Sequence, residues 1–178
     1  KLDGSGNVIK LNARCVARGD LFKKLYQTTE NQCFAPVART ASMSCDEAVC
    51  CLREQDMCSG DVPGAYLQGN QHKCEQIVVR PPVGFRKFDE RGVEILWLMN
   101  NPMYGQGDAG AIWNRTANEH FTQGKPTGCG FDRCNQDPCI YAKGATVDVE
   151  GQPQDRVSLT SYVDDWRLRC DPTKAARK

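Results

Sequence analysis

The chain lacks any apolar run long enough to cross a membrane, and residues 1–6 do not resemble a secretory signal peptide. It also lacks a C-x-x-C pair, a spacing typical of structural zinc sites. Positive charge is barely in excess, because 23 Lys and Arg stand against 22 Asp and Glu, for a net charge of +1. The lack of an apolar run and of a signal peptide argues against a membrane or secreted protein. The nearly neutral net charge gives no overall indication of nucleic-acid binding. We therefore expect an intracellular protein with no membrane partner.

Size and composition indicate one folded domain. The 178 residues are 40% hydrophobic and 25% charged, which allows a core and does not suggest disorder along the whole chain. We expect a single partial domain over residues 1–178. Because neither end shows an obvious feature of a natural chain terminus, we also expect the chain to be a fragment of a longer polypeptide.

Charge is unevenly distributed along the chain. Residues 1–40 carry seven Lys or Arg and three acids, residues 166–178 carry five and one, and residues 41–165 carry eleven and eighteen. A basic first segment beside an acidic centre fits a protein that grips phosphate next to a metal site. Ordinary solvated surface charge gives the same pattern, so the distribution alone does not decide.

The tetrad Tyr162-Val163-Asp164-Asp165 is the most informative motif. Two adjacent carboxylates raise each other's pKa unless a cation shares them, so their place in an apolar-flanked strand needs a reason. Successive strand side chains point to opposite faces, and both aspartates can turn toward one site only at a tight hairpin tip. Carboxylate oxygens are ligands that Mg²⁺ prefers. The tetrad therefore predicts a magnesium site at a hairpin tip.

Asp61 offers a third carboxylate upstream. It ends a short run that Pro63 and Gly64 terminate. Together with the tetrad it would complete a two-metal site for in-line phosphoryl transfer. An aromatic residue, Tyr66, follows five positions later, and a role as an ordinary core tyrosine is the alternative for it.

This arrangement resembles the palm of a reverse transcriptase, in which an Asp is followed by Ala and an aromatic, and later by a YxDD tetrad. The flanking sequence resembles the Ty1/copia retrotransposon type. The matching stretches follow the family's order over roughly residues 10 to 166: Ala13–Gly19, Phe34–Arg39, Val79–Phe85, Met103–Gly105, Ala111–Trp113 and Asp137–Lys143.

The resemblance implies an α+β fold with a reverse-transcriptase-like palm. The palm would cover about residues 41–170 and a partial fingers region about residues 1–40, with no thumb. Helices at 44–55 and 109–122 would back an antiparallel sheet. A hairpin would pair Cys139–Lys143 with Val157–Val163.

The catalytic residues implied by the resemblance are Asp61, Asp164 and Asp165. Asp61 and Asp164 would bridge two Mg²⁺ ions, for which Mn²⁺ can substitute, and Asp165 would hold the second ion more loosely. The reaction would be nucleotidyl transfer by an RNA-directed DNA polymerase.

The resemblance also implies four nucleotide-binding residues. Arg14 would contact the triphosphate of the incoming nucleotide, a role that suits a guanidinium, with a surface arginine as the alternative. Tyr66 would leave no room for a 2′-hydroxyl. Gly105 and Gln106 would lie under the incoming base and the template.

Partners and location follow from the same resemblance. The partners would be an RNA template, a DNA primer and dNTP, with the ribonuclease H and integrase of a retrotransposon polyprotein. The protein would lie in a cytoplasmic particle, in the nucleus or in both.

Departures from the family favour an alternative, a decayed non-catalytic copy that at most binds nucleic acid weakly. A Lys and a Pro-Arg pair of the family are missing around Gly107, Gly110 and Ala111, which removes two positive charges. Polar or charged residues also replace aliphatic ones around the tetrad: Ser158, Thr160, Ser161 and Trp166–Arg169.

Eleven cysteines leave a third hypothesis, a zinc-stabilised module in which the tetrad is a coincidence. Cys129, Cys134 and Cys139 are spaced by five, and His120 lies upstream. An odd count without a secretion signal favours free thiols instead.

Three local patterns predict further features. Apolar and polar side chains alternate over Val8–Val16, which predicts a half-buried strand. The S-x-x-E at 44–47 predicts a capping box at a helix start, with Val49 and Leu52 on the buried side. The apolar run Ile95–Met99 predicts a short buried segment.

Overall fold

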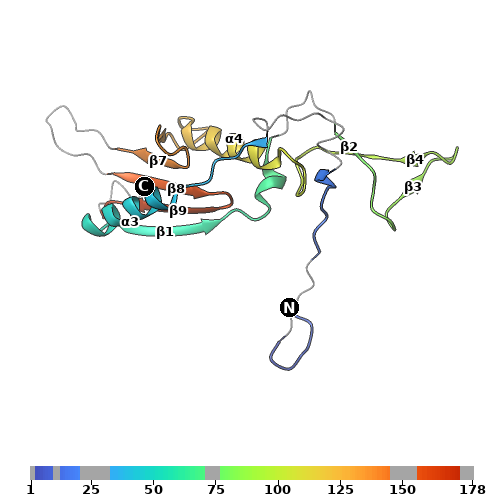
Figure 1. Cartoon of the computed structure of the whole chain (residues 1–178), viewed down its shortest axis with the longest axis horizontal. Coiled ribbons are helices and arrows are strands. Elements are labelled where there is room, and N and C mark those ends of the chain that lie inside the picture. The colour runs from blue at the N-terminus through green and yellow to red at the C-terminus, as the bar shows by residue number, and fades with distance from the viewer. Residues whose placement is uncertain (1–2, 10–12, 21–32, 71–76, 145–155, 173–178) are drawn as a thin grey trace.

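The computed structural model describes residues 3–9, 13–20, 33–70, 77–144 and 156–172 (Figure 1). A five-stranded antiparallel sheet has the order β1-β9-β8-β7-β6, and two short ribbons pair β2 with β5 and β3 with β4. The fold is therefore α+β, as the sequence predicted. None of the helices described is long and apolar enough to cross a membrane. The elements are α3 (Thr40–Leu52), β1 (Asp56–Asp61), the 3₁₀ helix η1 (Ala65–Gln68), β2 (Val78–Val79), β3 (Lys87–Phe88), β4 (Glu94–Ile95), β5 (Trp97–Leu98), α4 (Ala109–Thr122), β6 (Asp132–Arg133), β7 (Ile140–Lys143), β8 (Val157–Tyr162) and β9 (Asp165–Cys170).

The predicted C-terminal hairpin is confirmed. β7 pairs antiparallel with β8, and Tyr141 lies opposite Leu159. β8 turns directly into β9, whose other edge pairs with β1. Because strand side chains alternate, Leu159 lies on one face of β8, while Ser158 and Thr160 lie on the other.

α4 has the predicted bounds and covers the face of the sheet that carries Leu159. Ile112 is buried on this helix. Phe121 packs edge-on against Tyr141, with ring centroids 5.2 Å apart. Since Tyr141 is the cross-strand partner of Leu159, α4 packs on this apolar face.

α3 begins at Thr40, before the predicted start, so the capping box predicted at 44–47 is wrong. Those residues lie inside the helix, and the helix start is served by Asp137 from the loop before β7. The Asp137 carboxylate accepts a hydrogen bond from the Arg39 main-chain N–H at 2.9 Å and another from the Ser42 hydroxyl. Burial acts to raise the pKa of Asp137, but these hydrogen bonds outweigh it and hold the pKa below its usual value.

α3 turns a charged residue toward the sheet. Asp46 and Cys50 are buried, whereas Leu52 is 85% exposed, so the predicted buried side is wrong. The Asp46 carboxylate accepts hydrogen bonds from the Ser158 hydroxyl at 3.1 Å and the Thr160 hydroxyl at 2.9 Å. These partners come from β8, far along the chain, and they explain why the helix is rotated.

Arg169 of β9 completes this arrangement, which we call the polar cluster: Asp46, Ser158, Thr160 and Arg169. The Arg169 side chain is fully buried and forms an ion pair with Asp46. Its Nη1 also donates to the Thr160 hydroxyl at 3.1 Å. Three of the polar residues that depart from the family pattern, Ser158, Thr160 and Arg169, thus have hydrogen-bond or ion-pair partners. α3 packs on the polar face of the sheet.

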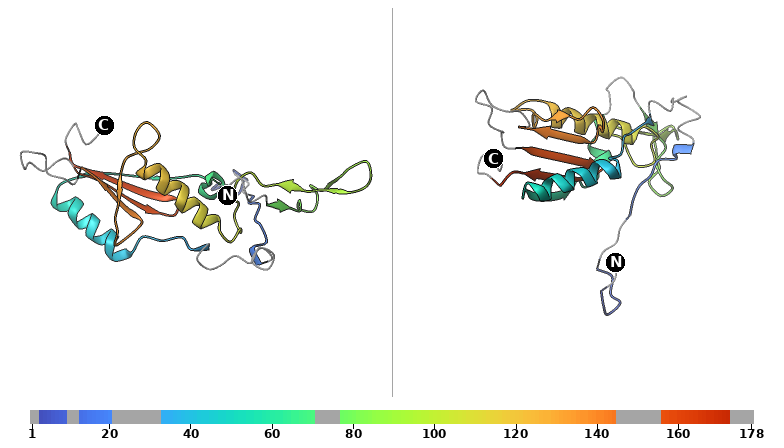
Figure 2. Two further views of the ribbon diagram at one scale, coloured as in Figure 1. Left: turned by 90° about the horizontal axis from the view of Figure 1, so that it is seen from above. Right: turned by 60° about the vertical axis from the view of Figure 1, so that its left-hand side comes forward.

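Residues 77–99 form an arm that extends away from the main sheet (Figures 1 and 2). β2, β3, β4 and β5 are each two residues long and pair only as two-stranded ribbons, which are marginally stable by themselves. The prediction of a buried segment at Ile95–Met99 is wrong, because Ile95 is 47% and Trp97 43% exposed. Phe85 and Phe88, also in the arm, are 65% and 60% exposed.

The strand predicted over Val8–Val16 does not form in the part that the structure describes. Val8 makes an isolated bridge, residues 13–16 have no regular structure, and residues 10–12 lie outside the description. Alternation alone does not make a strand without a sheet edge to pair with. The segment is instead attached further on, where the Ala17 N–H donates to the Tyr104 carbonyl at 2.7 Å.

Candidate active site at the β8–β9 hairpin

Val163 and Asp164 form the two-residue turn between β8 and β9, so the tetrad lies at a hairpin tip as predicted. Val163 has a φ of 59°. A positive φ at the first turn residue is the pattern of a type II′ turn, which normally has glycine there. For a β-branched residue this conformation is an outlier, so its surroundings must stabilise it.

The three aspartates predicted from the sequence come together at one end of the sheet. Asp61, the last residue of β1, lies directly opposite Asp165, the first residue of β9. Asp164 is the next residue of the turn, and its carbonyl accepts a hydrogen bond from the Val62 N–H at 2.9 Å. Cross-strand partners share a face, with Cβ atoms about 5 Å apart. All three aspartates are exposed to solvent.

These donors suit a hard cation that is shared with a substrate. Mg²⁺ is usually bound by one or two carboxylates together with substrate phosphates and water. Asp61 and Asp165 supply such a pair. Within the described ranges, no group of three or more His, Cys, Asp or Glu is placed to hold an ion by itself. The pair therefore fits a site that substrate oxygens complete, and it does not form an all-protein cage.

Hydrogen bonds hold the turn from two sides. Trp113 of α4 donates from its indole Nε1 to the Val163 carbonyl at 2.7 Å. On the other side, the Val62 N–H holds the Asp164 carbonyl. This bond from Trp113 was not assigned from the sequence. The available signal was its indole N–H, which needs an acceptor when the ring is buried.

Arg14 and Tyr66 lie around one aromatic ring, that of Tyr104. The Arg14 guanidinium carbon is 4.5 Å from the Tyr104 ring centroid, and the Tyr66 and Tyr104 centroids are 5.3 Å apart. A cation over an aromatic face is attracted by the ring quadrupole. Tyr66 belongs to η1, which begins shortly after Asp61 and contacts α4. The sequence did not single out Tyr104 as the residue that joins them.

Gly105 and Gln106 both make contacts with other residues of the chain in this structure. Gly105 has a φ of 84°, and an added Cβ would lie 2.6 Å from Val16 Cγ1 and overlap the Ala17 carbonyl. Glycine therefore allows the N-terminal segment to approach closely. Gln106 is buried and donates from Nε2 to Asp108 Oδ1 at 2.8 Å. Contacts of these two residues with a base or a template stay predictions.

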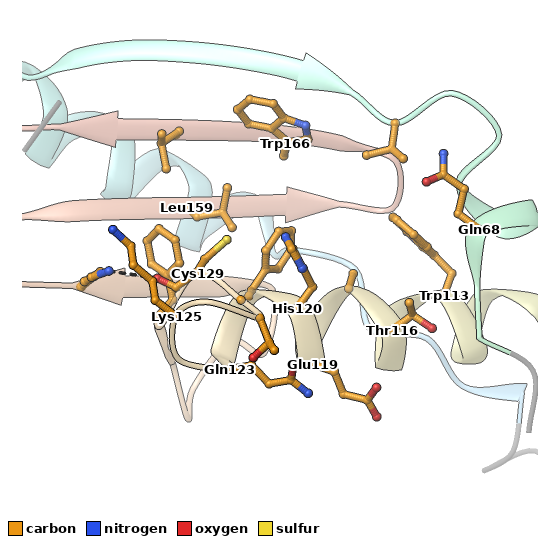
Figure 3. A pocket seen from close by; sticks show the side chains of 18 of the residues that line it. Gln68, Trp113, Thr116, Glu119, His120, Gln123, Lys125, Cys129, Leu159 and Trp166 are labelled. Atoms are coloured by element: carbon orange, nitrogen blue, oxygen red, sulfur yellow. Dashed lines mark hydrogen bonds between the residues drawn. The ribbon is translucent and has the colours of Figure 1, made fainter. Parts of the chain in front are cut away.

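A cavity of about 1050 Å³ lies between α4 and the apolar face of the sheet (Figure 3). Leu159 and Trp166 line its sheet wall, and Trp113 and His120 line its helix wall. Val62 also lines it. The two residues that hold the turn, Val62 and Trp113, thus form part of the cavity wall.

The three evenly spaced cysteines do not assemble a zinc site with His120. Cys139 is buried, and burial raises its pKa to about 11, which disfavours the thiolate that binds zinc. The Cys129 N–H donates to the His120 carbonyl at 2.9 Å, a main-chain contact. Because the described residues contain no metal-holding group of three or more ligands, the zinc hypothesis has no structural support here.

Comparison with known proteins bears directly on this site. No solved structure matches the chain. A family model described as reverse transcriptase (RNA-dependent DNA polymerase) matches residues 1–175, which include β1, η1, α4 and the tetrad hairpin. Because the match spans nearly the whole sequence, this chain belongs to the reverse transcriptase (RNA-dependent DNA polymerase) family.

Proposed function

We propose that the chain carries the nucleotidyl-transfer site of a Ty1/copia-type RNA-directed DNA polymerase. Family membership supports the reaction class, and the copia-like stretches in the sequence support the subtype. The proposed substrates are an RNA template, a DNA primer and dNTP. The proposed catalytic residues are Asp61, Asp164 and Asp165, with Mg²⁺ or Mn²⁺ as the cation.

One observation carries this proposal, the pairing of Asp61 with Asp165 beside the hairpin tip. These residues come from distant parts of the sequence, yet the β1–β9 ladder makes them direct partners. Two exposed carboxylates facing each other repel unless a cation lies between them. A structural role would be served better by a neutral pair.

The chain's own contribution to the reaction would be placement. A pair of bound cations would supply activation of the primer 3′-hydroxyl and stabilisation of charge on the triphosphate. Asp61 and Asp165 are fixed by their ladder, and Asp164 by the turn that Val62 and Trp113 hold. Fixed geometry lowers the barrier because little reorganisation is left for the reaction itself.

Two aromatic residues would define the nucleotide side of the site. Tyr104 holds the Arg14 guanidinium over its ring, where that cation would meet the triphosphate. Tyr66, whose ring also contacts Tyr104, would occupy the space that a ribose 2′-hydroxyl needs. Both roles rest on the resemblance to the family, and the geometry is compatible with them.

A second candidate is a non-catalytic relative that binds nucleic acid weakly. It is favoured by the missing Lys and Pro-Arg pair near Gly107 and Ala111, and by the lack of a three-ligand group among the described residues. Such a protein would bind an RNA–DNA hybrid in a salt-sensitive way without extending the primer.

Extension of a DNA primer on an RNA template in Mg²⁺ or Mn²⁺ tests the proposal. We expect Asp164→Asn to lower the extension rate by roughly 100-fold or more, because the cations would no longer be fixed in line. Asp132→Asn, an exposed aspartate in the edge strand β6, is the matched control and should extend at the parental rate. Unchanged extension by Asp164→Asn would place the site elsewhere, and binding without extension by the parent would favour the second candidate.

A further inference from the structure

The turn that carries Asp164 has an unfavourable sequence for its shape. Its first residue, Val163, is in the left-handed region with a φ of 59°. Hairpin turns of this kind normally have glycine at that position. Left alone, Val163 would favour other backbone conformations, and the two carboxylates that follow it would change direction with them.

Trp113 supplies a contact that favours the observed shape. Its indole Nε1, which can only donate, lies 2.7 Å from the Val163 carbonyl oxygen. This carbonyl belongs to the strained residue itself, so the bond acts on the peptide that links Val163 to Asp164. Trp113 and Val163 are both half-buried, which strengthens the bond relative to one in open water.

The helix that bears Trp113 is itself attached to the residues that follow η1. The Thr116 hydroxyl of α4 accepts a hydrogen bond from the Asn70 N–H at 2.9 Å and donates to the Ile112 carbonyl at 3.0 Å. An added Cβ on Gly69 would lie 3.0 Å from Ile112 Cγ2, so this segment packs closely on α4. Trp113 therefore projects from an element attached to the chain that follows Asp61.

We infer that Trp113 is a positioning residue: its indole N–H holds the Val163 peptide and thereby the turn that places Asp164 and Asp165 beside Asp61. This inference rests on the proposed function for its consequence, but the restraint on the turn stands on the geometry alone. Trp113 would touch neither substrate nor cation, and it would act through the turn.

The test uses Trp113→Phe, which keeps an aromatic ring in the cavity and removes the N–H. Trp97→Phe is the matched control, because it removes an indole N–H from the exposed arm. The double variant Trp113→Phe with Val163→Gly is the rescue, since glycine adopts a positive φ without strain. Circular dichroism and thermal melts establish that each variant is folded.

Two measurements are made on each protein. Hydrogen exchange of the Asp164 and Asp165 amides reports the turn, whatever the activity of the protein. Titration with Mn²⁺, first alone and then with a saturating dNTP, reports the carboxylates, and Asp164→Asn is the reference for loss of the site. For Trp113→Phe we expect faster exchange at the turn and Mn²⁺ affinity about 10-fold weaker. We expect Trp97→Phe to match the parent and the double variant to recover most of the Mn²⁺ affinity.

The outcomes separate the inference from the proposed function. Parental exchange at the turn in Trp113→Phe would overturn the positioning role, whether or not the protein binds Mn²⁺. Loosened exchange with parental Mn²⁺ affinity would also overturn it, because the turn would not control the carboxylates. A parent protein that binds no Mn²⁺ even with a dNTP present, together with a loosened turn in Trp113→Phe, would overturn the metal site while leaving the restraint on the turn in place.

Discussion

Gly60 of β1 has no side chain because its cross-strand partner, Trp166, occupies the space where one would be. The register pairs the two residues directly. An added Cβ at Gly60 would lie within 2.6 Å of Trp166 Cε2, a ring atom that cannot move independently of the indole. The ring lines the cavity between α4 and the sheet, and Gly60 is next to Asp61. A substitution at Gly60 should therefore disturb both the packing of the Trp166 ring and the position of Asp61.

We predict that Gly60→Ala lowers the free energy of unfolding by about 1–3 kcal/mol, the usual cost of overpacking. Gly124→Ala is the control, since an added Cβ there meets nothing within 4 Å. Urea unfolding measures both. Combining Gly60→Ala with Trp166→Leu removes the clash, so the two changes should be strongly non-additive. Simple additivity would show that the ring is not the obstacle.

At the scale of single residues, the sequence predicted the aspartates but not what holds them. The doubled carboxylate at 164 and 165 indicated a hairpin tip by itself, and the resemblance to the family added Asp61. The bond from Trp113 could not be predicted, because its acceptor is a main-chain carbonyl and leaves no trace in residue identity. Tyr104 was missed for a related reason, since Arg14 stacks on its ring face and makes no charge pair that spacing would reveal.

At the scale of elements, α3 is held to the sheet by the polar cluster where an apolar contact would serve. Asp46 and Arg169 are buried, and an aspartate removed from beside a buried guanidinium leaves an uncompensated charge. Arg169 Nε and Nη2 have no hydrogen-bond partner within the described part of the chain. Breaking the cluster should therefore cost stability, although the hydrogen-bonding capacity of Arg169 is not fully used in the intact cluster.

We predict that Asp46→Ala lowers the free energy of unfolding by about 3–5 kcal/mol, the usual cost of breaking a buried ion pair. Replacing the whole cluster by Asp46→Leu, Ser158→Val, Thr160→Val and Arg169→Leu should restore parental stability or exceed it. Arg18→Gln, at an exposed pair with Asp20 far from the cluster, is the control and should cost about 1 kcal/mol or less. A four-residue replacement less stable than Asp46→Ala would show that the cluster is needed for the packing itself.

The tetrad hairpin and α4 were predicted best. Both were expected from the resemblance to the family, and the doubled carboxylate indicated the hairpin tip independently. α3 was predicted to exist, but its start and its buried side were wrong. Asp137 serves the helix start from the loop before β7, and the partners of Asp46 lie on β8 and β9. No window of sequence around α3 contains that information.

At the scale of the whole molecule, the arm and the N-terminal segment were the least predictable. Apolar residues at Ile95–Met99 indicated burial, yet burial depends on what lies across from the arm, and the described residues leave its ribbons uncovered. The alternation of apolar and polar side chains over Val8–Val16 likewise has no partner strand among the residues that the structure describes. Both predictions failed for the same reason. A pattern of side chains indicates which face of a segment is apolar, but it does not indicate which other part of the molecule packs against that face.

Asp171 joins three distant parts of the main sheet region. Its carboxylate accepts hydrogen bonds from Arg53 Nε at 3.0 Å, Gln55 Nε2 at 2.7 Å and the Arg156 N–H at 2.7 Å. These donors lie after α3 and before β8, while Asp171 itself follows β9. The hydrogen bonds from Arg53 above all, opposed by burial, hold the pKa of Asp171 well below its usual value of 3.8.

The sign of the resulting pH dependence follows from the lowered pKa of Asp171 and of Asp137. A carboxyl group with a lower pKa in the folded protein binds its proton more readily in the unfolded chain. The stability that these groups contribute is therefore complete above the unfolded pKa, near 4, and is lost as the pH falls below it toward the folded values. We expect the free energy of unfolding, measured in urea, to decrease steadily from about pH 4 downward.

Asp171→Asn separates this contribution from that of other carboxyl groups. At pH 7 it should lower the free energy of unfolding by about 1–3 kcal/mol, because the Arg53 side chain and the Arg156 N–H lose a charged acceptor. Below about pH 4 its stability should fall less steeply than that of the parent, since one titrating group is gone. Glu90→Gln, exposed in the turn of the arm, should leave both the stability and the slope unchanged. If Asp171→Asn kept the parental slope below pH 4, the acid sensitivity would lie in other carboxylates, with Asp137 the first to examine by the same substitution.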